Sequence, residues 1–179
     1  MRFPPVIILI GFMGAGKTST GKDLAKALQF DFLDTDQWIE ERNNKKIAQI
    51  FKDDGESFFR SEEKEAINWI RNHSKSVIST GGGLWINEEN RNQLLSLGWC
   101  VWLEVSPKVA WRRVKPYLEQ RPLLAQENDP FSKIKQMEEV RNPLYQLAHA
   151  RFLTDHKDSK NVADDILSFL KKDSSIEFF

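Results

Sequence analysis

Short apolar runs alternate with longer amphipathic segments along this chain of 179 residues. Two of the runs, VIILI at 6–10 and WCVWLEV at 99–105, are almost continuously apolar, which is typical of strands buried on both faces of a parallel sheet. Strands that alternate with helical segments predict an α/β fold. The predicted strands are Val6–Ile10, Asp31–Leu33, Ser76–Ser79, Trp99–Val105 and Arg151–Thr154.

The segments between these strands carry helical periodicity. In Lys17–Leu28, for example, Leu24, Ala25 and Leu28 recur at the spacing of one helix face. The segment from Leu118 to Pro130 is polar and proline-rich, so it is predicted to be a mobile excursion from the fold. One predicted helical region spans residues 36–73 and is broken near 43–46 and at 55. The other predicted helices span 88–97, 131–149 and 162–171, and a further one begins at 107.

Composition limits the classes of protein that fit. A chain of this length with 40% apolar residues predicts one domain, spanning 1–179. Its 26 basic and 26 acidic residues argue against a general nucleic-acid binder, which would carry a basic excess. Because Cys100 is the only cysteine, an intramolecular disulfide and a cysteine-based zinc site are excluded. The balanced charge and the single domain favour a monomer.

The amino terminus resembles a signal peptide only superficially. Arg2 precedes an apolar run, but Pro4 and Pro5 interrupt the approach and the run leads directly into GKT. No other stretch nears the roughly 20 apolar residues that span a membrane. We therefore expect a cytoplasmic protein that does not bind membranes.

Residues 11–18 read GFMGAGKT and match the phosphate-binding loop G-x-x-x-x-G-K-[ST], between a predicted strand and a predicted helix. Glycines let the loop backbone wrap around a polyphosphate, and the loop N–H groups bind the anion. Lys17 is expected to reach the β- and γ-phosphates, and the Thr18 hydroxyl to bind Mg²⁺. The residues predicted to bind ATP are Gly14, Ala15, Gly16, Lys17, Thr18 and Ser19.

Other parts of the chain narrow the class of nucleotide-binding protein. GTPases read guanine with N-K-x-D, whereas the nearest string here, at 44–47, is NKKI. Motor-type ATPases end a later apolar strand with an acidic residue for Mg²⁺. The predicted strand at 76–79 leads instead into TGGG. These absences favour a small-molecule kinase.

Six segments in order resemble those of shikimate kinases, and the resemblance covers roughly residues 5–170. It implies a five-stranded parallel sheet of order 2-3-1-4-5 flanked by helices, a substrate-binding helical region at about 36–63 and a lid at about 115–130. It also implies transfer of the ATP γ-phosphate, with Mg²⁺, to the 3-hydroxyl of shikimate on the way to chorismate and the aromatic amino acids. The segments are LIGFMGAGKTSTG at 9–21, DTD at 34–36, IFKDDGESFFRSEE at 50–63, TGGG at 80–83, RPLL at 121–124 and RNPLY at 141–145.

The two carboxylates of DTD follow a predicted strand, so they should face the same cleft as the phosphate loop. The resemblance gives Asp34 the metal, through water, and gives Asp36 the substrate and the proton of the attacking hydroxyl. The alternative is a polar strand end at which Asp36 caps the next helix.

Two arginines are candidates for the substrate carboxylate. The resemblance directs Arg60 and Arg141 to it, where two guanidinium groups give planar, charge-assisted recognition. Arg60 could instead form a surface ion pair with Glu63. The glycines at 81–83 form a turn in either case, and the Gly82 N–H is expected to contact the substrate.

Arg121 lies within the predicted lid, where it would bind ATP and stabilise the transferring phosphoryl group. The resemblance leaves the adenine contact open among Arg112, Arg113, His156 and Lys157. Asn44 stands where many relatives have glycine, which is a mild change because asparagine tolerates turn conformations.

Two other functions compete with this one. A related small kinase, such as a gluconate kinase or a nucleoside monophosphate kinase, would use the same loop on another acceptor. A catalytically silent nucleotide-binding regulator would bind ATP without transferring its phosphate. Assays of ADP release with each acceptor, and of ATP binding without transfer, separate these possibilities.

Overall fold

A computed structural model describes residues 5–172 of the chain. Five parallel strands form one sheet in the order β2-β3-β1-β4-β5, which confirms the predicted topology. All four neighbouring pairs are parallel, and their register brings Asp34 of β2 opposite Ser79 of β3. The strands are β1 (Val6–Ile10), β2 (Asp31–Asp34), β3 (Ser76–Ser79), β4 (Trp99–Glu104) and β5 (Ala150–Leu153).

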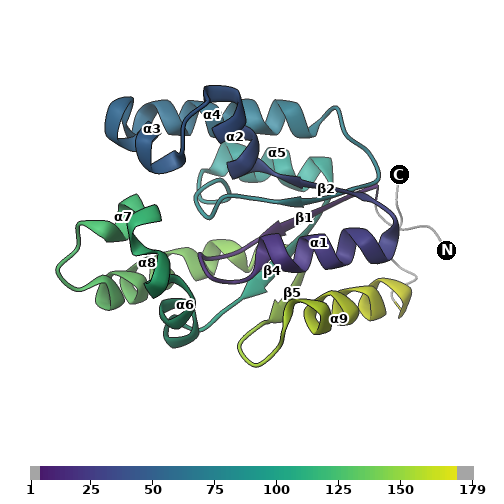
Figure 1. Ribbon diagram of the computed structural model, residues 1–179. Helices are drawn as coiled ribbons and strands as arrows, with labels where there is room; N and C mark the ends of the chain where they lie inside the picture. Colours follow the sequence, from purple (N-terminus) through teal and green to yellow (C-terminus); the bar gives the residue numbers. More distant parts are fainter. Residues whose placement is uncertain (1–4, 173–179) are drawn as a thin grey trace.

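Helices cover the sheet and extend beyond the carboxyl ends of its strands (Figure 1). Helices α1 (Lys17–Leu28) and α9 (Ser159–Lys172) pack side by side on one face. A second group of helices stands above the sheet in this view, and a third group lies to the left, beyond the carboxyl ends of the strands. The second group is α2 (Thr35–Asn43), α3 (Ile47–Asp53), α4 (Gly55–Ile70) and α5 (Glu88–Leu97); the third is α6 (Pro107–Val114), the 3₁₀ helix η1 (Lys115–Gln120), α7 (Pro122–Ala125) and α8 (Pro130–Tyr145).

The interior has two hydrophobic clusters. The larger one surrounds β1 and β4, whose side chains are almost completely buried, as the apolar runs predicted. The smaller one, made by Ile39, Ile50, Phe59 and Ala66, lies among α2, α3 and α4. The stacked rings of Trp38 and Trp69, 5.3 Å apart, join the edges of the two clusters. Helices α2–α4 therefore form a unit with an interior of its own.

Three predicted elements need correction. The helix predicted over 131–149 is α8 and ends at Tyr145, two residues after an internal proline, because the His149 N–H instead pairs with the Cys100 carbonyl at the start of β5. The helix predicted over 162–171 begins three residues earlier, where the Asp158 carboxylate accepts the Asn161 N–H at 2.7 Å. The predicted excursion at 118–130 is largely helical, because its prolines occupy helix starts, where a missing N–H costs nothing.

Two smaller points concern single features. Asn44 ends α2 with φ 49° and ψ 36°, the left-handed conformation that was expected there. Within residues 5–172, no helix combines the length and the apolar character that crossing a membrane requires.

Candidate active site

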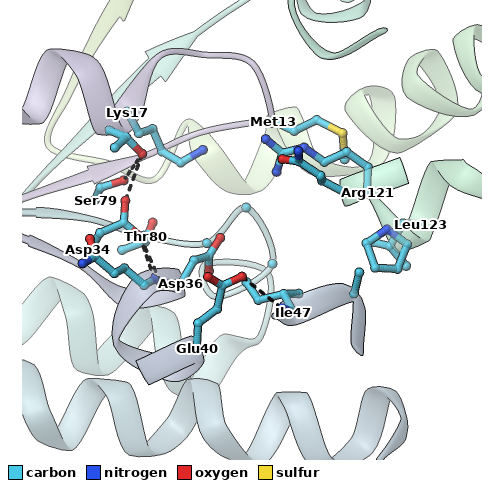
Figure 2. A pocket seen from close by; sticks show the side chains of 18 of the residues that line it. Met13, Lys17, Asp34, Asp36, Glu40, Ile47, Ser79, Thr80, Arg121 and Leu123 are labelled. Carbon is cyan, nitrogen blue, oxygen red and sulfur yellow. Dashed lines mark hydrogen bonds between the residues drawn. The ribbon is translucent and has the colours of Figure 1, made fainter. Parts of the chain in front are cut away.

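A cleft of about 1080 Å³ opens at the carboxyl ends of the strands, between α2–α4 on one side and η1, α7 and α8 on the other. This is the edge at which open α/β sheets bind ligands. Figure 2 shows Lys17, Asp36 and Arg121 pointing from three sides into one space. The cleft is lined by most of the residues predicted from sequence: Gly14, Gly16, Lys17, Thr18, Ser19, Asp34, Asp36, Arg60, Gly82, Arg121 and Arg141.

The phosphate-binding loop joins β1 to α1. Gly14 and Gly16 have φ of 76° and 88°, which side chains rarely tolerate, and Gly16 occupies the position before the first turn of α1. Lys17 Nζ donates to the carbonyls of Gly11 and Phe12 at 2.9 and 3.0 Å. Burial lowers the pKa of Lys17 to about 8, although Asp36 acts in the opposite direction. Lys17 lines the cleft, and its side chain loses its proton at a lower pH than an ordinary lysine does.

Asp34 uses both of its oxygens. Oδ1 accepts the N–H groups of Asp36 and Gln37 at 3.0 and 3.3 Å, so Asp34 caps α2. The alternative in which Asp36 caps this helix is therefore wrong. Oδ2 accepts the Thr18 hydroxyl at 2.9 Å, and the Ser79 hydroxyl lies 3.3 Å from the same Thr18 oxygen. Three oxygen-bearing side chains thus meet at the start of α1.

This group of oxygens fits Mg²⁺, which prefers carboxylate and hydroxyl oxygens together with phosphate. Among residues 5–172 there is no cluster of three or more His, Cys, Asp or Glu side chains able to hold a metal by themselves. Such a pattern suits an ion that is shared between the protein and bound phosphates rather than one held in an all-protein cage.

Asp36 has a different environment from Asp34. Its Oδ1 atom is buried and accepts no hydrogen bond from the described residues. Burial and the nearby Asp34 raise the pKa of Asp36 to about 7, while Lys17 acts to lower it. A Cβ atom on Gly81 would lie 2.4 Å from this oxygen, so only glycine leaves it room there. Asp36 therefore lines the cleft while its Oδ1 atom is buried against the glycine turn without a described donor.

Arg60 and Arg141 approach the same glycine turn from two helices. A Cβ atom on Gly83 would lie only 2.2 Å from Arg60 Nη1, so Arg60 packs closely against the turn. Arg141 Nη1 donates to the Gly82 carbonyl at 3.3 Å. Arg60 is also paired with Glu56 and Glu63, each at 2.7 Å. The ion pair expected as an alternative does exist, but the Glu63 side chain is only 3% exposed and lines the cleft, so this pair is not confined to the surface.

Arg121 joins η1 to α7 and reaches into the cleft from the side opposite Asp36 (Figure 2). Its Nε atom is buried and donates to no described residue. Its charge is close enough to depress the pKa of both Lys17 and Asp36. The structure therefore brings Lys17, Asp36 and Arg121 together, as their assignment to one reaction requires.

Comparison with known proteins places this geometry in a family. The family model described as shikimate kinase matches residues 13–171. The chain belongs to the shikimate kinase family. A curated shikimate kinase from Sulfurihydrogenibium is 43% identical over 166 residues, which cover 93% of this chain and 98% of the relative. Shikimate kinases transfer a phosphoryl group from ATP to shikimate, in the aromatic amino acid pathway.

Solved structures agree with this placement. The shikimate kinase from Acinetobacter baumannii, solved in complex with shikimate, matches with a TM-score of 0.90, 34% identity and coverage of 95% of this chain and 94% of that one. A gluconokinase from Sinorhizobium meliloti matches with a TM-score of 0.56 at 18% identity and covers 96% of this chain and 94% of that one, a likeness that concerns the fold alone. Of the related small kinases, the shikimate kinase family is the one that the comparisons show.

A second pocket of about 270 Å³ adjoins the phosphate-binding loop, on the side of α9. Arg113 and Lys157 line it, whereas Arg112 and His156 do not. Arg113 also braces the loop, because it donates to the Gly14 carbonyl at 2.9 Å and to the Thr154 carbonyl at 2.7 Å. Of the four candidates for the adenine contact, Arg113 and Lys157 therefore border a cavity beside the loop.

Several residues of this shikimate kinase site escaped the sequence analysis. Thr35 sits within DTD and Ser79 ends the strand before TGGG, yet nothing in these patterns shows which neighbour a hydroxyl contacts. Thr35 Oγ1 accepts the Gly81 N–H at 3.0 Å. Glu40 was not singled out, and Phe51 and Leu123 were quoted within their segments without a role, although all three line the cleft. Tyr145 was quoted in RNPLY without a role, and its hydroxyl donates to the Gly82 carbonyl at 3.0 Å.

Proposed function

We propose that this chain phosphorylates the 3-hydroxyl of shikimate with ATP and that the cleft described above is the site of transfer. The observation that carries the proposal is the Asp36 carboxylate, which lines one cleft together with a lysine of the phosphate-binding loop and with two arginines, one from α4 and one from α8. The phosphate-binding loop would hold the phosphoryl donor, the two arginines would bind a carboxylate, and Asp36 would act as the base. This arrangement matches an acceptor that is a carboxylated polyol. The substrates are then shikimate and ATP, and the chain acts as a monomer.

The acceptor side is built from helices α2–α4 and α8, and the substrate region is about 36–63. Arg60 and Arg141 would bind the shikimate carboxylate through charge-assisted hydrogen bonds. The Gly82 N–H, which donates to no described residue, would bind the substrate from the glycine turn. Asp36 would accept the hydrogen bond of the 3-hydroxyl and then its proton as the oxygen attacks.

The donor side is the phosphate-binding loop. Its N–H groups and Lys17 would hold the β- and γ-phosphates, with Ala15, Gly16 and Ser19 around them. Adenine would occupy the pocket bordered by Arg113 and Lys157. Thr18 and Asp34, the latter through water, would hold Mg²⁺. Bound there, the ion would neutralise phosphate charge.

Transfer then depends mainly on positioning and electrostatics. The 3-hydroxyl oxygen forms a bond to the γ-phosphorus, the bond to the β-phosphate oxygen breaks, and the hydroxyl proton passes to Asp36. Lys17 and Arg121 stabilise the negative charge on the transferring group. The segment 115–130 acts as a lid, because Arg121 comes from it, and closure excludes water that would otherwise accept the phosphate.

A coupled ADP-release assay with ATP and Mg²⁺ tests the proposal. Shikimate, gluconate and nucleoside monophosphates are offered in parallel, and we expect turnover with shikimate far above that with the others. Asp36→Asn keeps the size of the side chain but removes its basicity, so it should lower kcat by about 10²-fold or more while ATP affinity stays unchanged. Turnover of Asp36→Asn at the wild-type rate would refute the role of Asp36. A folded, ATP-binding sample without activity on shikimate would refute the function itself.

A further inference from the structure

Three consecutive glycines form the wall of the cleft between Arg60 and Arg141, and such a segment has unusual conformational freedom. A binding surface made from it needs restraints from outside. The peptide N–H of Gly81 is held by Thr35 Oγ1 at 3.0 Å, and the carbonyl of Gly81 accepts the Leu84 N–H at 3.2 Å. These two contacts fix the first half of the turn.

The second half of the turn is held from α8. The Gly82 carbonyl accepts two hydrogen bonds, one from the Tyr145 hydroxyl at 3.0 Å and one from Arg141 Nη1 at 3.3 Å. Arg141 and Tyr145 stand one helical turn apart on α8, so both reach the same oxygen from one face of the helix. Of the two donors, the tyrosine is the closer one.

Tyr145 is itself held rigidly. It is completely buried, and its ring stacks on Trp102 of β4 with 5.9 Å between centroids and 24° between planes. The neighbouring Leu144 carbonyl accepts the Trp85 indole N–H at 2.8 Å, which fixes the last turn of α8. Burial raises the pKa of Tyr145 to about 12, so its hydroxyl remains a neutral donor near neutral pH.

We infer that Tyr145 is a positioning residue for acceptor binding, because its hydroxyl fixes the Gly82–Gly83 peptide and leaves Arg141 free to turn its guanidinium toward the substrate carboxylate. The inference rests on the proposed function. Without the Tyr145 hydroxyl, Arg141 would be the only remaining donor to the Gly82 carbonyl. Binding shikimate would then leave this half-buried carbonyl unpaired or would leave Arg141 misplaced, and either outcome weakens binding of the acceptor rather than of ATP.

Tyr145→Phe tests this with the loss of a single oxygen. One neutral hydrogen bond contributes enough that we expect the KM for shikimate to rise about threefold to tenfold. The KM for ATP should stay within about twofold, because the Tyr145 hydroxyl donates to the glycine turn and makes no hydrogen bond to the phosphate-binding loop among the described residues. Ser76→Ala serves as the control, since it removes a buried hydroxyl at the amino-terminal end of β3, far from the cleft, and should alter neither KM.

A readout independent of activity is available from the nine glycines of the chain. In protein labelled with ¹⁵N-glycine, Tyr145→Phe should shift the amide signals of the 81–83 turn and leave those of the phosphate-binding loop in place. The inference would be overturned if a folded Tyr145→Phe variant had the KM values of the wild type and unshifted signals from the turn. A parallel rise in both KM values would overturn it as well, because that would indicate a general loss of structure.

The outcomes for Tyr145 and for the proposed function remain distinguishable. If the wild type fails to phosphorylate shikimate, the function is wrong, whereas a wild type that is active beside an unaltered variant refutes only the role of Tyr145. Should Tyr145→Phe not fold, 3-fluorotyrosine in the natural sequence gives a more acidic hydroxyl without altering the fold. The stronger donor should shift the Gly83 amide signal, and an unshifted signal would contradict the contact.

Discussion

At the scale of single residues, the site depends on two carboxylates two positions apart that have opposite environments. Asp34 is saturated with hydrogen bonds, because it caps α2 and accepts the Thr18 hydroxyl. Asp36 has a buried oxygen with no described partner and a raised pKa. Environments that differ in this way allow one carboxylate to act as a fixed ligand and the other to exchange a proton.

The pKa shifts predict a narrow pH optimum. Asp36, whose pKa is raised to about 7, must be ionised to accept a proton, so kcat/KM for shikimate should rise as pH increases through about 7. Lys17, whose pKa is lowered to about 8, must keep its proton to bind phosphate, so the rate should fall above about 8. Because the two groups interact, the limbs report apparent values of the pair. A profile measured from about pH 5.5 to about 9.5 should be bell-shaped, and a flat one would contradict both assignments.

The different roles of Asp34 and Asp36 show which features of single residues the sequence could predict. The loop GFMGAGKT and the DTD pair were placed correctly at the sheet edge, because each follows a strand and parallel strands end together. The alternative interpretation named Asp36 as the cap of α2, whereas Asp34 is the cap. The two side chains are chemically identical, and only backbone geometry selects between them. The contacts of Thr35 and Tyr145 were missed because each joins residues that are far apart in the sequence, 46 and 63 positions respectively.

At the scale of elements, the strands and several long periodic helices were predictable, whereas the short helices were not. Helices α1 and α5 match their predicted bounds, because each has a clear apolar face or a glycine that ends it. The short helices η1 and α7 were read as an excursion, since few apolar side chains distinguish them from a loop. Helix α3, only 7 residues long, depends on a side chain from outside for its start.

That side chain is Glu40 of α2, and it gives an element-scale prediction. Glu40 Oε1 accepts the Ile47 N–H at 3.0 Å, and Oε2 pairs with Lys46 at 2.7 Å; the labelled Glu40 and Ile47 are joined in Figure 2. Because the Lys46 side chain is 82% exposed, the pair with it contributes little, and the bond to the start of α3 is the important contact. Glu40 thus holds in place the wall of the cleft formed by Ile47 and Phe51.

Glu40→Ala should therefore lower the free energy of unfolding by about 1 kcal/mol and raise the KM for shikimate more than the KM for ATP. Thermal unfolding and steady-state kinetics measure the two effects. Glu40→Gln is the matched control, because its amide oxygen can still accept the Ile47 N–H, and it should retain most of both properties. Equal losses in the two variants would show that charge, and not the start of α3, is what matters.

At the scale of the whole molecule, a chain of zero formal net charge places four cations where phosphate and carboxylate would bind. The sequence has 26 basic and 26 acidic residues, so its net charge conceals this arrangement. Lys17, Arg60, Arg121 and Arg141 all line one cleft, which lies between α2–α4 on one side and η1, α7 and α8 on the other. Ligands that bind in this cleft contact both parts of the molecule and should stabilise them together.

Ligand-dependent stability tests that arrangement. A ligand at 100 times its Kd stabilises the native state by about 2.7 kcal/mol, which for a chain of this size raises Tm by roughly 5 to 11 °C. We expect shikimate and ADP each to produce such a rise, measured by differential scanning calorimetry. Arg141→Met removes one cation from the acceptor side only, so at the same concentrations the rise with shikimate should largely disappear while the rise with ADP persists. Loss of both responses would mean that the two halves of the cleft are not separate binding sites.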